Sequence, residues 1–313
     1  MSLLSVEHLE SQFVTEDGIV KAVDDVSFEI ANNETLGLVG ESGCGKTVLA
    51  LSILRLLSEN TKTRGIIRYR GRDLLQLSED DLMAIRGREI AQIFQNPLSS
   101  LNPVLTVGFQ ISEPFMLHQG LKRKAARIKA VEMLERVRIP LPEERAREYP
   151  HEFSGGMRQR AMIAMGLACK PSLIIADEPT RGLDVTIQAQ VVELMKELIK
   201  ESCASMLIIT HDLSLAAELC DKIAVMYSGE ILEYAGIQDF FRKPAHPYSK
   251  CFLESLPARG MKPIRGISPS LIDPPPGCRF CPRCDHAREE CKHVHPDLMK
   301  VKEGQYARCH IYA

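Results

Sequence analysis

The chain has 313 residues, more than the usual length of one domain (about 100 to 200 residues), which indicates one large domain with an appendage or two domains. Hydrophobic residues make up 45% of it and charged residues 26%, values that exclude a disordered or fibrous protein. The formal net charge of -2 gives the chain as a whole no electrostatic attraction to nucleic acid or to an acidic membrane.

No uncharged apolar run approaches the length of about 18 residues that a membrane span requires. AMIAMGLAC, at 161–169, is typical of the longest runs. The first residues, MSLLSVEHLESQ, reach Glu7 and Glu10 before an apolar segment of signal-peptide length can form. We therefore expect a cytosolic protein that does not cross a membrane.

The first 38 residues alternate apolar and polar side chains, as in LLSVEHLESQFV and AVDDVSFEI, which predicts short antiparallel strands. TLGLVG, at 35–40, follows as a buried strand, and KTVLALSILRLL, at 46–57, as a helix. GIIRYRGRDL, at 65–74, predicts an edge strand and a turn.

The segment GESGCGKT joins the buried strand to the helix and matches the phosphate-binding pattern G-x-x-x-x-G-K-[ST]. Its glycines let backbone N–H groups surround a phosphate, Lys46 adds a positive charge to the β- and γ-oxygens, and Thr47 offers a hydroxyl to Mg²⁺. A glycine-rich turn with an exposed lysine is the alternative. The predicted nucleotide-binding residues are Gly40, Glu41, Ser42, Gly43, Cys44, Gly45, Lys46 and Thr47.

Residues 96–167 have a mainly helical pattern. In LKRKAARIKAVEMLERV, at 121–137, apolar residues recur at mostly three-residue steps between lysines and arginines. They are Leu121, Ile128, Val131, Leu134 and Val137.

HEFSGGMRQR, at 151–160, places a Ser-Gly-Gly turn before another helix-like segment. The backbone N–H groups of Ser154, Gly155 and Gly156, with the serine hydroxyl, suit an anion at a helix N-terminus. A capped turn without a ligand is the alternative. A second phosphate cradle in a chain that already has one raises the question of why one nucleotide would need two.

Polar side chains follow three further apolar strands. SLIIADE ends at Asp177 and Glu178, SMLIITH ends at His211, and Gln95 follows the strand before Asn-Pro. Beside a phosphate loop, Asp177 can hold Mg²⁺ through water, and Glu178 can orient or deprotonate an attacking water. His211 can donate a hydrogen bond to the γ-phosphate. The alternative for His211 is a strand-end residue without a catalytic role, and the alternative for Gln95 is a turn residue.

A helix is predicted over 184–202 with Asp184 as its N-cap, and KIAVMYSGEILEYA, at 222–235, adds strands. Strands that alternate with helices predict an α/β fold with a mainly parallel sheet and helices on both faces. After about Leu256, six prolines in residues 257–277 predict an extended connector.

Five of the ten cysteines lie in the last 36 positions: Cys278, Cys281, Cys284, Cys291 and Cys309. In a reducing cytosol such a cluster indicates a metal site more than disulfides. The spacings suit tetrahedral zinc, and four thiolates equally suit an iron–sulfur cluster. Mixed zinc ligation stays open through His286, His293, His295 and His310.

The phosphate loop, FQNP, FSGGMRQR, IIADE, GLD and a strand-end histidine, in this order, resemble the ATP-binding subunit of an ABC transporter over residues 1 to about 256. The resemblance implies a P-loop NTPase core with an N-terminal antiparallel β subdomain, a helical subdomain at about 96–167 and a Cys-rich C-terminal extension at 257–313. In that family the Ser-Gly-Gly turn of one subunit clamps the γ-phosphate held by the other. The two cradles would therefore serve two sites in a head-to-tail dimer.

Carried over by position, the resemblance implies ATP and Mg²⁺ as ligands. It assigns catalytic roles to Glu178, His211 and Gln95, Mg²⁺ binding to Thr47, Gln95 and Asp177, a dimer-interface role to Asp184, and adenine stacking to Phe13, for which a place in the core is the alternative. Two positions depart from the family. Met157 stands where the family often has Gln, and RGLD replaces smaller residues before Leu183, but neither removes a backbone donor.

ESGCGKTVLALSILRLL, IFQNPLSSLNPVLTVG, HPYSKCFLESLP and PPPGCRFCPRC are similar to the ATPase subunits of bacterial dipeptide and oligopeptide importers, a group that also includes nickel importers. The resemblance implies a second ABC ATPase, as a homo- or heterodimer, two membrane permeases and an external solute-binding protein as partners, at the cytoplasmic face of the membrane. It also implies a 4Fe-4S cluster on Cys278, Cys284, Cys291 and Cys309, with Cys281 outside the ligand set and zinc as the alternative.

Two other function classes are alternatives to a transporter subunit. The first is a soluble ABC ATPase, either of DNA repair or of iron–sulfur assembly. The DNA-repair type needs a long coiled coil, for which the insert of about 70 residues is too short. A metal-sensing nucleic-acid-binding protein is disfavoured by the nearly neutral composition. We therefore expect no nucleic-acid partner.

Overall fold

The computed structural model describes residues 2–313 and divides into two compact units. The first consists of Met1–Gln76 and Ile209–Ala313, and the second of Leu77–Ile208. The division expected at residue 256 lies inside the first unit and remains a prediction.

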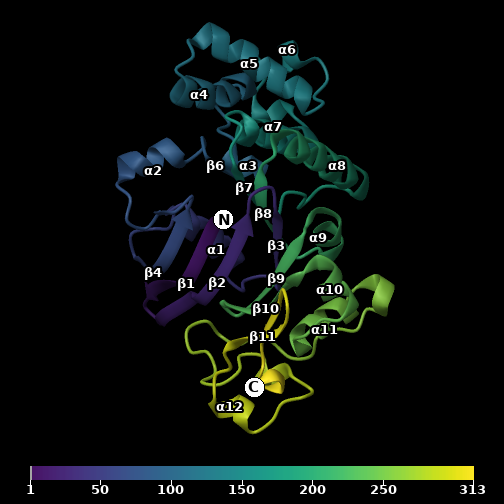
Figure 1. Cartoon of the computed structure of the whole chain (residues 1–313). Helices are drawn as coiled ribbons and strands as arrows, with labels where there is room; N and C mark the ends of the chain where they lie inside the picture. The colour runs from purple at the N-terminus through teal and green to yellow at the C-terminus, as the bar shows by residue number, and fades with distance from the viewer. Residues whose placement is uncertain (1) are drawn as a thin grey trace. The chain divides into compact units, whose positions relative to one another are not determined.

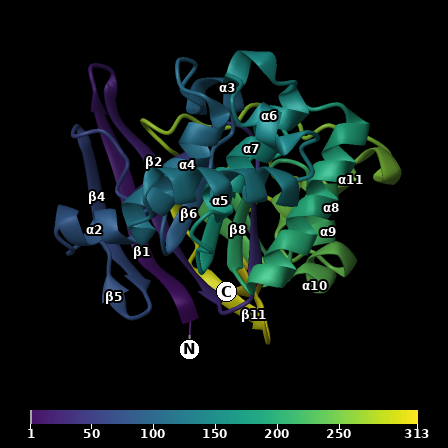
Figure 2. The same cartoon turned by 90° about the horizontal axis from the view of Figure 1, so that it is seen from above.

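The first unit contains a four-stranded sheet in the order β2-β1-β4-β5. Its strands are β1 (Ser2–Thr15), β2 (Gly18–Ala31), β4 (Thr61–Tyr69) and β5 (Arg72–Asp73). All three pairings are antiparallel, as expected, and β1, β2 and β4 lie side by side in Figures 1 and 2. The prediction of an edge strand for residues 65–74 is wrong for β4, because β4 lies between β1 and β5. Within the predicted segment, only the two residues of β5, Arg72 and Asp73, lie at the edge of the sheet.

A second set of strands in the first unit has the order β11-β12-β10-β9-β3. Its members are β3 (Thr35–Val39), β9 (Lys222–Tyr227), β10 (Glu230–Gly236), β11 (Leu298–Lys302) and β12 (Gln305–Arg308). β3 pairs with β9 in parallel, and the remaining pairs are antiparallel. The tail therefore extends this set of strands, because β12 pairs with β10 and β11 pairs with β12.

The helices of the first unit are α1 (Lys46–Ile53), α9 (Leu213–Leu219), α10 (Ile237–Arg242), α11 (Pro247–Glu254) and α12 (Glu290–His293). The β3 strand is wholly buried, and Cys220, directly after α9, lies so close to Gly37 that an added Cβ there would be 2.8 Å from its sulfur. This close packing fixes the strand that leads into the phosphate loop.

The second unit contains strands and a group of helices. The strands are β6 (Ile90–Ile93) and β7 (Leu173–Asp177), which pair in parallel, and most of β8 (Ser205–Thr210), which neighbours β7. The helices are α2 (Glu79–Ile85), α3 (Pro97–Ser100), α4 (Val107–Gln119), α5 (Arg123–Arg136), α6 (Pro142–Arg145), α7 (Gly155–Leu167) and α8 (Val185–Ser202). Helices α4, α5 and α7 pack on one another, as Figures 1 and 2 show.

The predicted apolar face of the helix at 121–137 is wrong in part. Ile128 is 56% exposed, whereas Ala126, Ala130 and Leu134 are fully buried. Steps of three residues drift around a helix of 3.6 residues per turn, and steps of four and three together stay on one face. Small alanines therefore lie on the buried side of α5, which packs on α4 and α7.

His246 is a buried N-cap in the first unit. Its Nδ1 accepts a hydrogen bond from the Tyr248 backbone N–H at 3.0 Å, at the start of α11, and the side chain is 1% exposed. Burial lowers the pKa of His246 to about 3. The ring is therefore neutral in the folded chain.

We expect this histidine to make the folded state less stable in mild acid. Between about pH 6.5 and pH 3 the unfolded chain protonates the ring and the folded chain does not, so the free energy of unfolding falls as pH falls. The loss by pH 5 should be about 2 kcal/mol. Urea titrations at pH 7 and pH 5 should show this part of the dependence disappear in His246→Asn, which retains an N-cap acceptor. An unchanged dependence in the variant would refute the assignment.

No helix within residues 2–313 combines the length and the apolar character needed to cross a membrane.

Candidate functional site

The phosphate loop of the first unit runs from Gly40 to Gly45 between β3 and α1. Gly40 and Gly45 have φ of 157° and 108°, in the region that side chains disfavour. A Cβ added at either would lie 2.0 Å from a carbonyl oxygen, that of Met226 for Gly40 and that of Ala22 for Gly45. The pattern therefore has glycine where the backbone approaches its neighbours too closely for any side chain.

Lys46 is 7% exposed and closes this loop on itself. Its Nζ donates hydrogen bonds to the carbonyl oxygens of Gly40 and Glu41, both at 2.9 Å. Cys44 is buried beside it, and burial raises the pKa of the Cys44 thiol. Thr47 is exposed in the first turn of α1, where its hydroxyl can reach a ligand. The arrangement places a buried positive charge beneath a turn of backbone N–H groups, which suits a polyphosphate.

Gly45→Ala is expected to destabilise the loop strongly. The new methyl group would overlap the Ala22 carbonyl oxygen, and the alanine would have to keep the positive φ of Gly45. We therefore expect the free energy of unfolding to fall by more than about 3 kcal/mol. Gly43→Ala is the matched control, because Gly43 also has positive φ but nothing lies within 4 Å of its Cβ position. That variant should lose only about 1 to 2 kcal/mol. Equal losses in chemical denaturation would contradict the steric argument.

The acidic pair of the second unit stands at the end of β7. Every residue of this strand is buried, Asp177 is 2% exposed and Glu178 is 8% exposed. Glu178 has φ of 47°, a left-handed conformation that is unfavourable for glutamate. Strained backbone of this kind persists where the surrounding structure imposes it, and it clusters at functional sites.

The Ser-Gly-Gly turn caps α7 in the second unit. Ser154 is the N-cap residue, and its Oγ accepts a hydrogen bond from the Met157 backbone N–H at 3.3 Å. Ser154 and Gly155 are exposed, so the first backbone N–H groups of a helix of 13 residues face solvent. A Cβ at Gly156 would lie 2.6 Å from Cγ2 of Ile187 on α8, which explains the glycine there.

The other predicted residues have the local positions expected. Asp184 caps α8, with its Oδ1 accepting from the N–H groups of Thr186 and Ile187 at 3.1 and 3.0 Å. Gln95 is half-buried between β6 and α3, His211 is exposed directly after β8, and Phe13 is half-buried on β1. Lys46, Thr47, His211 and Phe13 belong to the first unit, and Gln95, Asp177 and Glu178 to the second.

The five tail cysteines line one cavity of about 20 Å³ in the first unit, together with His286 and His310. All five are free thiols. Burial raises the pKa of Cys278 to about 12 and also raises the pKa values of Cys281, Cys284 and Cys309. Across the described part of the chain, residues 2–313, no three His, Cys, Asp or Glu side chains are already arranged to hold a metal ion. The cavity therefore brings together thiols of the kind that bind zinc or iron–sulfur groups, and the described residues do not hold them in a ready-made metal site.

A phosphate loop between a buried strand and a helix, with an acidic pair at the end of a second buried strand, defines a phosphate-loop ATPase. Comparison with known proteins specifies which kind. Residues 23–181 match the ABC transporter family, and residues 232–291 match the family described as the oligopeptide/dipeptide transporter, C-terminal region.

Two relatives match over nearly the whole chain. The probable peptide ABC transporter ATP-binding protein y4tR of Sinorhizobium fredii is 48% identical over 98% of this chain and 94% of its own. The oligopeptide transport ATP-binding protein AppD of Bacillus subtilis is 46% identical over 99% of this chain and 97% of its own. A solved structure of the ATP-binding cassette MJ0796, a dimer in a post-hydrolysis state with ADP and Pi, covers 75% of this chain and 98% of its own at 26% identity, with a TM-score of 0.68.

The chain belongs to the ABC transporter family of ATP-binding proteins, as the resemblance implied, and it is an ATPase.

Proposed function

We propose that this chain is the ATP-hydrolysing subunit that energises a membrane importer of di- or oligopeptides. The observation that carries the substrate class is the match of residues 232–291 to the oligopeptide/dipeptide transporter C-terminal region, together with relatives named for peptide transport. The match includes three of the four predicted cluster ligands, Cys278, Cys284 and Cys291.

In this proposal each predicted site residue has one role at the bound nucleotide. The phosphate loop binds the β- and γ-phosphates, and Thr47, Gln95 and Asp177 would hold Mg²⁺, which supplies charge neutralisation on the phosphates when bound. Glu178 takes a proton from a water that attacks the γ-phosphorus in line, and ADP leaves on the opposite side. His211 donates a hydrogen bond to a γ-phosphate oxygen as negative charge builds on it. Phe13 stacks on the adenine ring.

Two ATPase subunits are proposed to face each other head to tail, this chain with a copy or with a related ATPase. The exposed turn at Ser154 and Gly155 would supply N–H donors to the triphosphate held by the partner, and Asp184 would lie at the same interface. The dimeric cassette MJ0796 in its ADP- and Pi-bound state supports this arrangement. In this arrangement the two phosphate cradles of one chain would serve two different nucleotides.

ATP binding is proposed to bring the two ATPase subunits together, and the segment from Gln95 through the helical insert, at about 96–167, is proposed to pass this closing motion to two membrane permeases. Three exposed apolar side chains of this segment would be available for such a contact, namely Leu98, Val104 and Leu117, which are 64%, 74% and 77% exposed. An external solute-binding protein would select the cargo, and the ATPase would be a peripheral protein at the cytoplasmic face of the membrane.

The tail is proposed to hold a 4Fe-4S cluster through Cys278, Cys284, Cys291 and Cys309, with zinc as the alternative. Convergence of these thiols on one cavity supports the proposal. A bound cluster would act as a clip that holds together a tail too small to make its own core. Assays of the purified chain for iron, acid-labile sulfide and zinc test it. About four iron atoms per chain are expected in the wild type and in Cys281→Ser, and few in Cys284→Ser; one zinc without sulfide would favour the alternative.

Reconstitution with the membrane partners tests the transport function. The complex in proteoliposomes should accumulate labelled peptide only when ATP is supplied on the side of this subunit, and a solute-binding protein charged with peptide should stimulate ATP hydrolysis. Nickel uptake without peptide uptake would instead support the nickel importer. An intact complex that takes up neither peptide nor nickel would overturn the proposal.

A further inference from the structure

Three arginines of the tail are almost completely buried, and each is next to a cysteine of the cavity. Arg279 follows Cys278, Arg283 precedes Cys284, and Arg308 precedes Cys309. Their exposed fractions are 4%, 5% and 4%. Because a buried guanidinium without a partner is very unfavourable, the partners of these side chains show what the tail is attached to.

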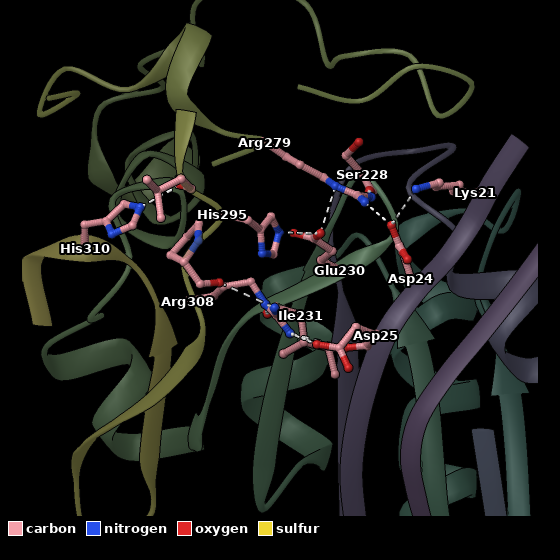
Figure 3. Close-up of polar contacts among 12 residues, drawn as sticks. Lys21, Asp24, Asp25, Ser228, Glu230, Ile231, Arg279, His295, Arg308 and His310 are labelled. Carbon is pink, nitrogen blue, oxygen red and sulfur yellow. Dashed lines mark hydrogen bonds and ion pairs between the residues drawn. The ribbon is translucent and has the colours of Figure 1, made fainter. Parts of the chain in front are cut away.

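Arg279 and Arg308 attach the tail to β2 and β10 (Figure 3). Nε of Arg279 lies 2.8 Å from Glu230 Oε1, and Arg279 also donates to Asp24 and to the Ser228 carbonyl. His295 contacts the same Glu230 oxygen at 2.7 Å.

On the neighbouring side, Nη2 of Arg308 donates to Asp25 Oδ2 at 3.0 Å and Nε donates to the Ile231 carbonyl at 3.3 Å. These two arginines therefore hold the tail on the strands of the first unit.

Arg283 has a different partner, because it reaches the phosphate loop itself. Its Nη1 and Nη2 donate to Oε2 and Oε1 of Glu41 at 2.9 and 3.0 Å, a two-bond pairing of guanidinium with carboxylate. Ser268 of the connector donates to Glu41 Oε2 at 2.7 Å, and Arg283 Nη1 also donates to the Tyr227 hydroxyl at 3.2 Å. Glu41 is the second residue of GESGCGKT.

Glu41 is thus held at three points. Arg283 holds its carboxylate, the Tyr248 hydroxyl accepts from its backbone N–H at 3.2 Å, and Lys46 donates to its carbonyl oxygen at 2.9 Å. Burial acts to raise the pKa of the Glu41 carboxyl, but the hydrogen bonds from Arg283 and Ser268 outweigh it, and the pKa is lowered. The side chain is accordingly a carboxylate at neutral pH.

We propose that Arg283 is a positioning residue for nucleotide binding, which acts through Glu41 to hold the phosphate loop in the shape that accepts ATP. This inference rests on the nucleotide site proposed above and adds a role for the tail in it. A loop that is already ordered loses less conformational entropy when it binds phosphate, so its fixation appears as affinity for ATP. The tail therefore contributes to the ATP site of its own chain.

Equilibrium binding of Mg-ATP to the full-length chain, measured by titration calorimetry, tests the proposal. Arg283→Met keeps much of the side chain's volume and removes its charge, and we expect the dissociation constant for ATP to rise about tenfold or more. Arg283→Lys retains the charge without the two-bond geometry and should give an intermediate rise. Glu41→Gln removes the same pairing from the loop side and should resemble Arg283→Met.

Two controls separate positioning from general stability. Arg308→Met breaks a comparable buried tail contact away from Glu41, so it should lower Tm but change the dissociation constant less than about twofold. Lys300→Ala removes an exposed cation of the tail that pairs with exposed Glu303, and it should change neither quantity.

The double variant Glu41→Gln/Arg283→Met tests whether the two residues act together. Its dissociation constant should be no higher than that of the weaker-binding single variant, because both changes break one interaction. Affinity equal to wild type in the Arg283 variants, or effects that multiply in the double variant, would overturn the proposal. Absence of ATP binding in the wild type would instead refute the nucleotide site itself, so the two failures are distinguishable.

Discussion

Replacing Glu178 with glutamine is expected to reduce the rate constant for ATP hydrolysis about 100-fold or more, while the dissociation constant for ATP changes less than about threefold. Glutamine has nearly the same shape as glutamate but cannot accept a proton from water at neutral pH. Glu178 directly follows a buried strand, is 8% exposed and has a backbone φ of 47°. Single-turnover release of phosphate, with ATP binding measured separately, checks the result.

Glu193→Gln is the control for this change. Glu193 is an exposed residue of α8 that pairs with Lys196, and its replacement removes one negative charge from the same unit. Its rate should equal that of the wild type. Normal hydrolysis in Glu178→Gln would reject Glu178 as the base and direct attention to His211.

Placing an acid in the Ser-Gly-Gly turn is expected to abolish hydrolysis without unfolding the chain. A Cβ at Gly155 would have Leu183 at 3.8 Å as its nearest neighbour, an ordinary contact, so Gly155→Asp fits sterically. The new carboxylate would repel the γ-phosphate where the turn should donate N–H bonds. We expect the hydrolysis rate to fall about 100-fold to 1,000-fold, with ATP binding to the phosphate loop of the monomer unchanged.

Ala125→Asp provides the comparison, because it adds the same side chain to an exposed position on α5. It should leave the hydrolysis rate unchanged. Circular dichroism should show equal helix content in both variants. If Gly155→Asp hydrolyses ATP at the wild-type rate, the turn has no part in the reaction.

Local sequence patterns predicted the parts of the site that depend on local backbone. The phosphate loop was found because its steric requirement for glycine and its lysine lie within eight consecutive residues, Gly40 to Thr47. Asp184 was identified as an N-cap for the same reason, since its acceptor oxygen bonds to N–H groups only two and three residues away. Family resemblance, not spacing, supplied the roles of Gln95 and Phe13, which remain predictions.

Features that depend on distant residues were missed or misjudged. Arg283 and Glu41 are 242 positions apart, so nothing near either residue indicates their pairing. A usable signal was present, however, in the arginine adjacent to each of Cys278, Cys284 and Cys309. The exposed Ile128 on α5 shows a second limit of prediction from sequence. The spacing of large apolar residues did not reveal that the face with the small alanines is the buried one.

ATP hydrolysis is proposed to require a composite site that two subunits share. The most direct measurement is the hydrolysis rate per chain across a dilution series, with the association state determined by sedimentation at each concentration. We predict almost no hydrolysis by the monomer and a rate per chain that rises as dimer forms, either from the chain itself or on addition of its related ATPase. A monomer that hydrolyses ATP as fast as the assembled pair would contradict the account.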